Sequence, residues 1–188
     1  MATQPSEPII GINDLPMSFH VKYLGHELAR GLWGIKHTRR PVDNLVTSAK
    51  NLPQNEILPL VTIEVSKEGL KMRPLTKKKQ DKEQEIFFKV DTISYGVQDV
   101  IYTRVFCMII VKEGDTKGIA PFHCHAFVCE SRNQARQITY ALAAAFQEYG
   151  RKVKDENKNN PDGIKKKFAI DLRSPEELEG ALDDETEA

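Results

Sequence analysis

The stretch from Asp91 to Tyr149 constrains the fold more than any other part of the chain. Three short apolar segments, DTISYGVQD, TRVFCMIIV and FHCHAFVC, precede the long segment SRNQARQITYALAAAFQEYGRKVK. The short segments are typical of strands, and apolar residues that recur every three or four positions predict an amphipathic helix in the long one. This helix must bury its apolar face, and the strands offer the only large apolar surface for it.

The predicted helix carries one apolar stripe, formed by Ala135, Ile138, Leu142, Ala145, Phe146, Tyr149 and Val153. Four alanines, at positions 141 and 143 to 145, increase its helix propensity. Ser131 is the predicted N-cap, because its hydroxyl can accept a hydrogen bond from a backbone N–H of the first turn.

The segments before this stretch predict further strands and one helix. FHVKYLG alternates like a half-buried strand and ends at Gly25, a predicted bend or bulge. RPVDNLVTSAKNL predicts a helix with Pro41 in its first turn. LPLVTIEVSKEGLKMRPL predicts a hairpin that turns at Glu68 and Gly69, and EIFFKV begins the next strand. The whole pattern predicts an α+β fold, a sandwich or partly open barrel of antiparallel strands plugged by the C-terminal helix.

Composition favours a cytosolic globular domain. The 188 residues are 29% charged and 40% hydrophobic, and no apolar run reaches the roughly 20 residues that span a bilayer. The segment MATQPSEPII has neither the pattern of a secretory signal nor a glycine after Met1 for myristoylation. Three cysteines do not suggest a disulfide framework. We expect a flexible N-terminus over 1–16, one domain over 17–154, and a polar linker with an acidic tail over 155–188.

Charge is divided unevenly along the chain. Residues 169–188 hold eight acids and one base, a net charge of −7, and the rest of the chain carries +7. Ser174, Pro175 and Glu177 form a helix-start signature with a capping box. Because the tail has few apolar residues to offset the entropy of ordering, it is expected to be dispensable for folding.

Six segments, taken in order, resemble the phosphotyrosine-binding (PTB) domains, in particular the Disabled, Numb and lipoprotein-receptor adaptor group. These segments are FHVKYLG, VTIEVSKEGLKM, ISYGVQD, VFCMII, CHAFVC and AAAFQEYG. The resemblance covers about residues 17–154. It implies a pleckstrin-homology-like fold of two antiparallel sheets capped by the long C-terminal helix.

The resemblance also implies a function, that of an adaptor without enzymatic activity or cofactor. Such a protein binds Asn-Pro-x-Tyr peptides in the cytoplasmic tails of membrane receptors and links this cargo to endocytosis or signalling. We expect a monomer that is cytoplasmic, or peripheral at the plasma membrane or endosomes, and that does not require tyrosine phosphorylation of its ligand. The peptide would add as a strand to a sheet edge beside the helix. The implied contacts are Ile93, Ser94, Tyr95, Gly96, Val97, Gln98, Ile138, Leu142, Phe146 and Tyr149.

An alternative function is a phosphoinositide-binding module with a basic patch. Its candidate residues are Lys77, Lys78, Lys79, Lys165, Lys166 and Lys167. Lysine runs are more often solvated loops, and no nucleic-acid recognition motif accompanies them.

The positions of the histidines and cysteines argue against two further functions, metal binding and nucleophilic catalysis. Alternation sends Cys124 to one face and both His123 and His125 to the other, so four metal ligands do not converge. Cys107, Cys124 and Cys129 each lie in an apolar strand, where cysteine behaves as a small hydrophobic residue rather than as a nucleophile. We therefore expect neither a metal site nor a catalytic residue.

Overall fold

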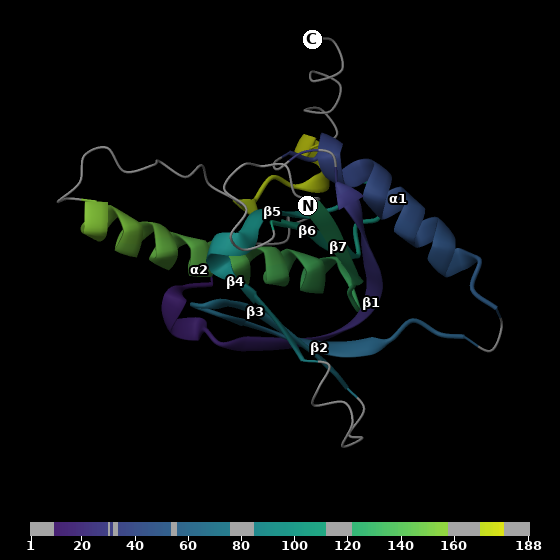
Figure 1. Ribbon diagram of the computed structural model, residues 1–188, viewed down its shortest axis with the longest axis horizontal. Coiled ribbons are helices and arrows are strands. Elements are labelled where there is room, and N and C mark those ends of the chain that lie inside the picture. The colour runs from purple at the N-terminus through teal and green to yellow at the C-terminus, as the bar shows by residue number, and fades with distance from the viewer. Residues whose placement is uncertain are drawn as a thin grey trace, which may run out of the picture.

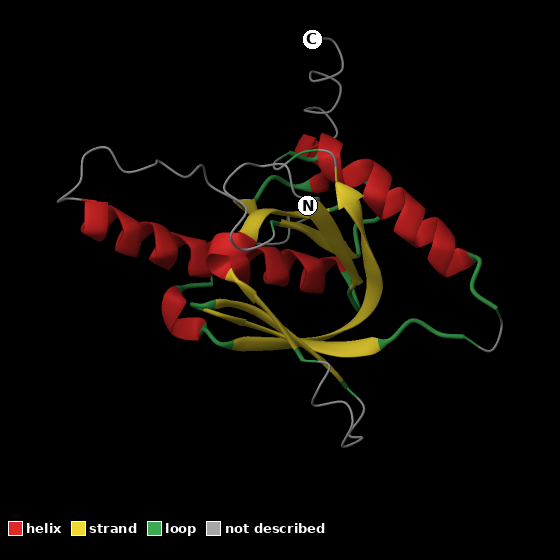
Figure 2. Cartoon of the chain, in the orientation of Figure 1, coloured by secondary structure: helices red, strands yellow, loops and turns green. Residues whose placement is uncertain are grey.

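The computed structural model describes residues 10–29, 31, 34–53, 56–75, 85–111, 122–157 and 170–178. Its strands are β1 (Met17–Ala29), β2 (Leu60–Ser66), β3 (Gly69–Pro74), β4 (Ile86–Lys89), β5 (Ile93–Gln98), β6 (Val105–Ile110), β7 (Phe122–Val128) and β8 (Ile170–Asp171). Its helices are α1 (Lys36–Lys50) and α2 (Arg132–Asn157), and η1 (Ile12–Asp14) and η3 (Val90–Thr92) are 3-10 turns. The predicted order of strand, helix, antiparallel strands and long helix is confirmed (Figures 1 and 2).

The long strand β1 joins the two halves of the sheet. Residues from Met17 to Lys22 pair with β2, and residues from Lys22 to Ala29 pair with β7. The register shifts between Tyr23 and Gly25, where glycine takes a φ of 109°, so the predicted bulge is confirmed. In the described part of the chain the strands form one hydrogen-bonded sheet in the order β4-β3-β2-β1-β7-β6-β5-β8. The two antiparallel layers of the prediction are therefore one sheet bent at β1 (Figure 2).

Helix α2 lies between the two halves of the bent sheet. It contacts β2 and β3 on one side and β5 and β6 on the other (Figure 1). Its buried residues Ile138, Ala141 and Leu142 join a core with Phe106 and Phe127 of the strands. The helix thus closes the open end of the sheet, as predicted. Its start is also as predicted, because the Ser131 hydroxyl accepts from the Gln134 N–H at 3.0 Å.

Helix α1 covers the outer face of β1, β6 and β7. Val42 and Leu45 belong to a second core with Cys107, Cys124 and Ala126, and α1 contacts β1, β6 and β7. The strands β5 to β7 are consequently buried on both faces, which explains why their sequences are continuous apolar runs.

Two details of the sequence interpretation were wrong. Helix α1 begins at Lys36, so Pro41 lies inside the helix rather than in its first turn. The earlier turn is stabilised by the Thr38 hydroxyl, which donates to the Ile35 carbonyl at 2.9 Å. The hairpin turn consists of Lys67 and Glu68. Gly69 is already the first residue of β3 and pairs with Ser66, the last residue of β2. Only glycine fits there, because a Cβ would lie 2.0 Å from the Phe88 carbonyl oxygen.

The segment from 170 to 178, which the sequence assigns to an acidic tail, lies against the domain. Ile170 and Leu178 are 2% and 0% exposed. Ser174 and Glu177 form the predicted capping box, with reciprocal N–H to side-chain distances of 3.4 and 3.3 Å. Burial of two aliphatic side chains supplies the stabilisation that the segment's acidic composition alone does not suggest.

Candidate functional site

Strand β5 is the strand to which the sequence assigns peptide binding. One edge pairs with β6, with a register shift between Ile93 and Tyr95. The other edge pairs in parallel with β8, where Gly96 lies opposite Ile170 and Val97 lies opposite Asp171. The yellow segment in Figure 1 is residues 170–178, and its first two residues form this added strand. The edge therefore accepts a strand, and in this structure a part of the same chain occupies it.

Gly96 sets how closely the added strand approaches. A Cβ at this position would lie 2.8 Å from Cδ1 of Ile170 and 3.4 Å from the Phe106 ring. The Ile170 side chain therefore fills the space that any larger residue at position 96 would take. It joins the core between the strands and α2, which makes the slot beside Gly96 an aliphatic subsite.

Asp171 is fixed on the opposite face of β5. Its carboxylate accepts from the Tyr95 hydroxyl at 2.7 Å and from the Arg173 guanidinium at 2.9 and 2.7 Å. Burial by itself raises the pKa of Asp171, but hydrogen bonds from Arg173 and Tyr95 outweigh it and the net pKa is lowered. Burial and the neighbouring Asp171 charge raise the pKa of Tyr95 well above its ordinary value. Tyr95 thus stays a neutral donor to a charged acceptor.

The rest of the segment follows the start of α2. Arg136 donates to the Arg173 carbonyl at 3.2 Å, and Arg132 forms an ion pair with Glu176 at 2.6 Å. Leu178 enters the second core, under α1. The segment therefore contacts both cores, one through Ile170 and the other through Leu178.

Gln98 connects the end of β5 to the start of α2. It is 1% exposed, and its Nε2 donates to the carbonyls of Thr103 and Arg132 at 2.7 and 3.3 Å. Among the described residues, its Oε1 has no hydrogen-bond partner. The side chain thus acts as a brace between strand and helix rather than as an open contact surface.

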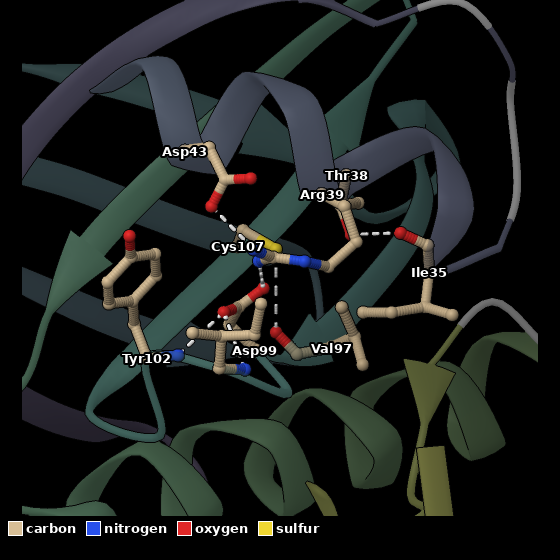
Figure 3. Close-up of polar contacts among 9 residues, drawn as sticks. Ile35, Thr38, Arg39, Asp43, Val97, Asp99, Tyr102 and Cys107 are labelled. Carbon is tan, nitrogen blue, oxygen red and sulfur yellow. Dashed lines mark hydrogen bonds and ion pairs between the residues drawn. The ribbon is translucent and has the colours of Figure 1, made fainter. Parts of the chain in front are cut away.

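Asp99 anchors the turn after β5, as Figure 3 shows. Its carboxylate accepts from the N–H groups of Ile101 and Tyr102 at 3.0 and 2.8 Å and pairs with Arg39 of α1 at 2.5 Å. Arg39 also reaches Asp43 on its own helix. Asp99 is fully buried, so this ion pair fixes the end of β5 to α1.

On α2, the residues of the predicted peptide site differ from the sequence interpretation in their exposure. Ile138 and Leu142 are fully buried in the core, so in this structure no peptide can reach them. Phe146 is half-buried at the margin of the same core, and Tyr149 is also half-buried. These two aromatic residues are the part of the predicted wall that stays accessible.

A family model described as "Phosphotyrosine interaction domain (PTB/PID)" matches residues 18–170. The chain belongs to the PTB/PID family. Low density lipoprotein receptor adapter protein 1-A of Xenopus laevis is 29% identical to this PTB protein over 130 residues, 69% of this chain and 39% of the relative. The human low density lipoprotein receptor adapter protein 1 is 28% identical with the same coverage. The match thus spans about two-fifths of the curated relatives' length.

Solved structures agree with the fold of this PTB protein. The solution structure of the C-terminal phosphotyrosine interaction domain of APBB2 from mouse has a TM-score of 0.55 and 23% sequence identity. The alignment covers 77% of this chain and 93% of that domain. The pleckstrin-homology-like α+β architecture expected from the sequence is confirmed.

The histidines and cysteines of this PTB domain contact protein groups. The Tyr23 hydroxyl lies 2.8 Å from Nδ1 of His125, and His26 and His123 lie ring to ring. Within the described residues, no three His, Cys, Asp or Glu side chains are grouped to hold a metal ion. A hydrogen bond with Cys124 and burial raise the pKa of the Cys107 thiol, and burial raises the pKa of Cys129 to about 12. Neither thiol is activated as a nucleophile.

The predicted basic patch lies outside the described residues, since both lysine runs fall in ranges 76–84 and 158–169. Two hollows open elsewhere on the described surface. One of about 570 Å³ lies between Pro16, Lys71 and Phe87, and a more apolar one of about 380 Å³ lies between α1 and Tyr102. No described helix is long and apolar enough to cross a membrane.

Sequence reasoning missed the residues that occupy the β5 edge, Ile170 and Asp171, and the anchor Asp99. A usable signal was present for the first two. The apolar island FAIDL is followed at once by the helix-start signature of Ser174, and two ordered elements in an acidic tail indicate a docked segment. Asp99 gave no such signal, because its partner Arg39 lies 60 positions earlier.

Proposed function

We propose that this PTB domain binds extended Asn-Pro-x-Tyr peptides from the cytoplasmic tails of membrane receptors and links this cargo to endocytosis or signalling. The relatives named as low density lipoprotein receptor adapters support the receptor-tail part of this proposal. The peptide would add to β5 and turn at Asn-Pro, which favours a turn. The half-buried Phe146 and Tyr149 of α2 would provide its apolar wall.

The observation that carries the proposal is the capacity of β5 for strand addition. Gly96 and Val97 already form backbone pairs with an added strand of the same chain. Such pairing satisfies N–H and C=O groups without regard to side-chain identity, so a peptide in trans can use the same groups. The subsite beside Gly96 takes an aliphatic side chain in this structure, which supports an aliphatic residue in the peptide at the matching position.

Binding is proposed not to depend on tyrosine phosphorylation. Four arginines are considered as ligands for a phosphate on the tyrosine: Arg39, Arg40, Arg73 and Arg104. Arg39 is paired with Asp99 and Asp43, and the Nε of Arg104 donates to the Cys129 carbonyl at 3.1 Å. Arg39 and Arg104 therefore already have protein partners, whereas phosphotyrosine recognition needs a guanidinium fork directed at the phosphate.

The test is a fluorescence-anisotropy titration of the full chain with three labelled peptides. One contains Asn-Pro-x-Tyr, the second has alanine for the tyrosine, and the third is phosphorylated on it. We expect saturable binding of the first, loss with the second, and less than a tenfold difference, about 1.4 kcal/mol, for the third. Absence of binding to all three would refute the receptor-tail function, and a tenfold gain with the third would refute phosphate independence.

Amide chemical-shift mapping locates the bound peptide. Shifts over Ile93–Gln98 and the exposed end of α2 are expected. Shifts confined to the lysine runs on addition of phosphoinositide vesicles, with β5 unaffected by peptide, would favour the lipid-binding alternative instead.

A further inference from the structure

We propose that residues 170–178 are an intramolecular ligand of this domain, which closes the β5 edge and competes with the receptor-tail peptide. This regulation rests on the proposed function, because it concerns the same edge of β5. The segment pairs with Gly96 and Val97, within the strand that a peptide would need. The two ligands cannot occupy these backbone groups at the same time.

The segment is held at three places that are specific to its sequence. Ile170 fills the slot above Gly96, with a side chain that is 2% exposed. Asp171 accepts hydrogen bonds from the Tyr95 hydroxyl and from Arg173. Leu178 is buried in the second core, at the end of a turn capped by Ser174. The segment thus has a buried aliphatic side chain at each end and a hydrogen-bonded carboxylate beside the first. These contacts depend on its sequence, as expected of a specific intramolecular ligand.

The pairing is also short enough to be displaced. β8 has two residues and runs parallel to β5, whereas β5 has six. Parallel pairs are slightly less stable per residue than antiparallel ones, and a peptide that pairs along all of β5 gains more backbone hydrogen bonds. A longer strand in trans can therefore replace the shorter strand in cis, and the closed state raises the threshold for binding rather than abolishing it.

Contacts between the start of α2 and the segment 170–178 link the β5 edge to the surface of the molecule. Arg132 pairs with Glu176, whose side chain is 65% exposed, and Arg136 holds the Arg173 carbonyl. A change at this exposed end that frees the segment also frees the β5 edge, since one continuous stretch of nine residues, 170–178, makes both sets of contacts.

The expected size of the effect follows from population arithmetic. If only the open state binds peptide, the apparent Kd equals the intrinsic Kd divided by the open fraction. A closed state populated to about 90% weakens apparent binding about tenfold. Opening the segment by mutation should recover this factor, without any change to the residues that contact the peptide.

The experiment compares full-length wild type with Ile170→Asp, which places a charge in the aliphatic slot. We expect at least tenfold tighter binding of the Asn-Pro-x-Tyr peptide, together with amide shifts at Gly96 and Val97 before peptide is added. Asp171→Ala is the second variant, in case Ile170→Asp loses its native circular dichroism spectrum. It removes the acceptor for Tyr95 and Arg173 but leaves the core side chain in place, and it should tighten binding in the same direction.

Glu85→Gln is the matched control outside the segment, at the exposed ion pair between Glu85 and Lys71 of β3. It removes a single exposed ion pair and should change affinity by less than threefold, because exposed pairs contribute little. Folded Ile170→Asp and Asp171→Ala proteins that bind peptide no more tightly than wild type would overturn the regulation and leave the proposed function standing. Failure of wild type and both variants to bind would overturn the proposed function, and the regulation with it.

Discussion

At the scale of single residues, the position of β5 is fixed by buried side chains rather than by side chains that would face a ligand. Asp99 ties the following turn to α1 through Arg39, and Gln98 joins the strand to the start of α2. Tyr95 donates across the edge to Asp171. These contacts hold β5 from three directions, so the backbone groups at its edge are presented in a fixed geometry to whichever strand is added.

Asp99→Ala should destabilise the domain by about 3 kcal/mol, because it leaves the Arg39 charge and two turn N–H groups without their buried acceptor. Asp43→Ala removes the other partner of the same guanidinium. Its side chain is 49% exposed, so a loss of less than about 1 kcal/mol is expected. Urea unfolding of the two variants checks the difference. Equal losses would show that the Arg39 pair with Asp99 is not an anchor.

His125 should make stability depend on pH. Burial, aided by the charges of His26 and His123, lowers its pKa from 6.5 to about 3. The unfolded chain then binds the proton first, so this contribution to stability is complete above about pH 6.5 and is lost as the pH falls towards 3. About 3 kcal/mol should disappear between pH 7 and pH 4, at about 1.4 kcal/mol per pH unit.

Chemical unfolding of wild type and His125→Gln over this pH range measures the His125 contribution as the difference in slope. Glutamine can still accept from the Tyr23 hydroxyl but cannot take up a proton. Identical slopes for the two proteins would contradict the assignment of the pH dependence to His125.

At the scale of elements, α2 has three roles along its length. Its first half supplies buried core residues, whereas Phe146 and Tyr149 are only half-buried. Its start also holds the segment 170–178 through Arg132 and Arg136. The helix therefore supports the sheet, holds the segment 170–178, and in the proposed function forms a wall for the peptide.

Phe146→Val should weaken peptide binding by about 1–3 kcal/mol, the range for loss of an aromatic hot spot. Isothermal titration calorimetry gives the affinity, and circular dichroism and melting report any loss of core packing. Phe87→Val is the matched control: the same change on β4, where the ring is 43% exposed at the other end of the sheet. Equal affinities for the two variants would show that Phe146 does not contact the peptide.

At the scale of the whole molecule, the segment 170–178 connects the two cores that lie on opposite faces of β5. It also adds β8 to the sheet, beyond the strands that precede α2. Stability and peptide affinity are therefore linked, because one closing equilibrium affects both.

A chain ending at Lys167 should melt below the full chain, contrary to the expectation from composition. A closing equilibrium that weakens binding tenfold contributes about 1.4 kcal/mol, which corresponds to a fall of about 3–6 °C for a domain of this size. Differential scanning calorimetry measures the shift, and peptide titration of the same protein measures the gain in affinity. A melting temperature equal to that of the full chain would show that Ile170 and Leu178 do not stabilise the domain.

Local patterns in the sequence determined the element order. The alternation in FHVKYLG, the apolar runs VFCMII and CHAFVC, the stripe of α2 and its Ser131 cap are all set by neighbours within a few positions. These patterns, with six segments in order, were sufficient for the family and the fold. The strand proposed to receive a peptide was also located from sequence, through the family resemblance.

Only the tertiary structure decided what lies on that strand. Pairing of Gly96 with Ile170, the Tyr95 bond to Asp171 and the Arg39 bond to Asp99 join residues that are 60 to 76 positions apart. No local periodicity encodes such contacts. Composition marked residues 169–188 as an acidic tail, yet two buried aliphatic side chains and one hydrogen-bonded carboxylate placed part of that tail on β5. Burial depends on which surfaces meet in space, and that is settled by the folded sheet rather than by the average polarity of a segment.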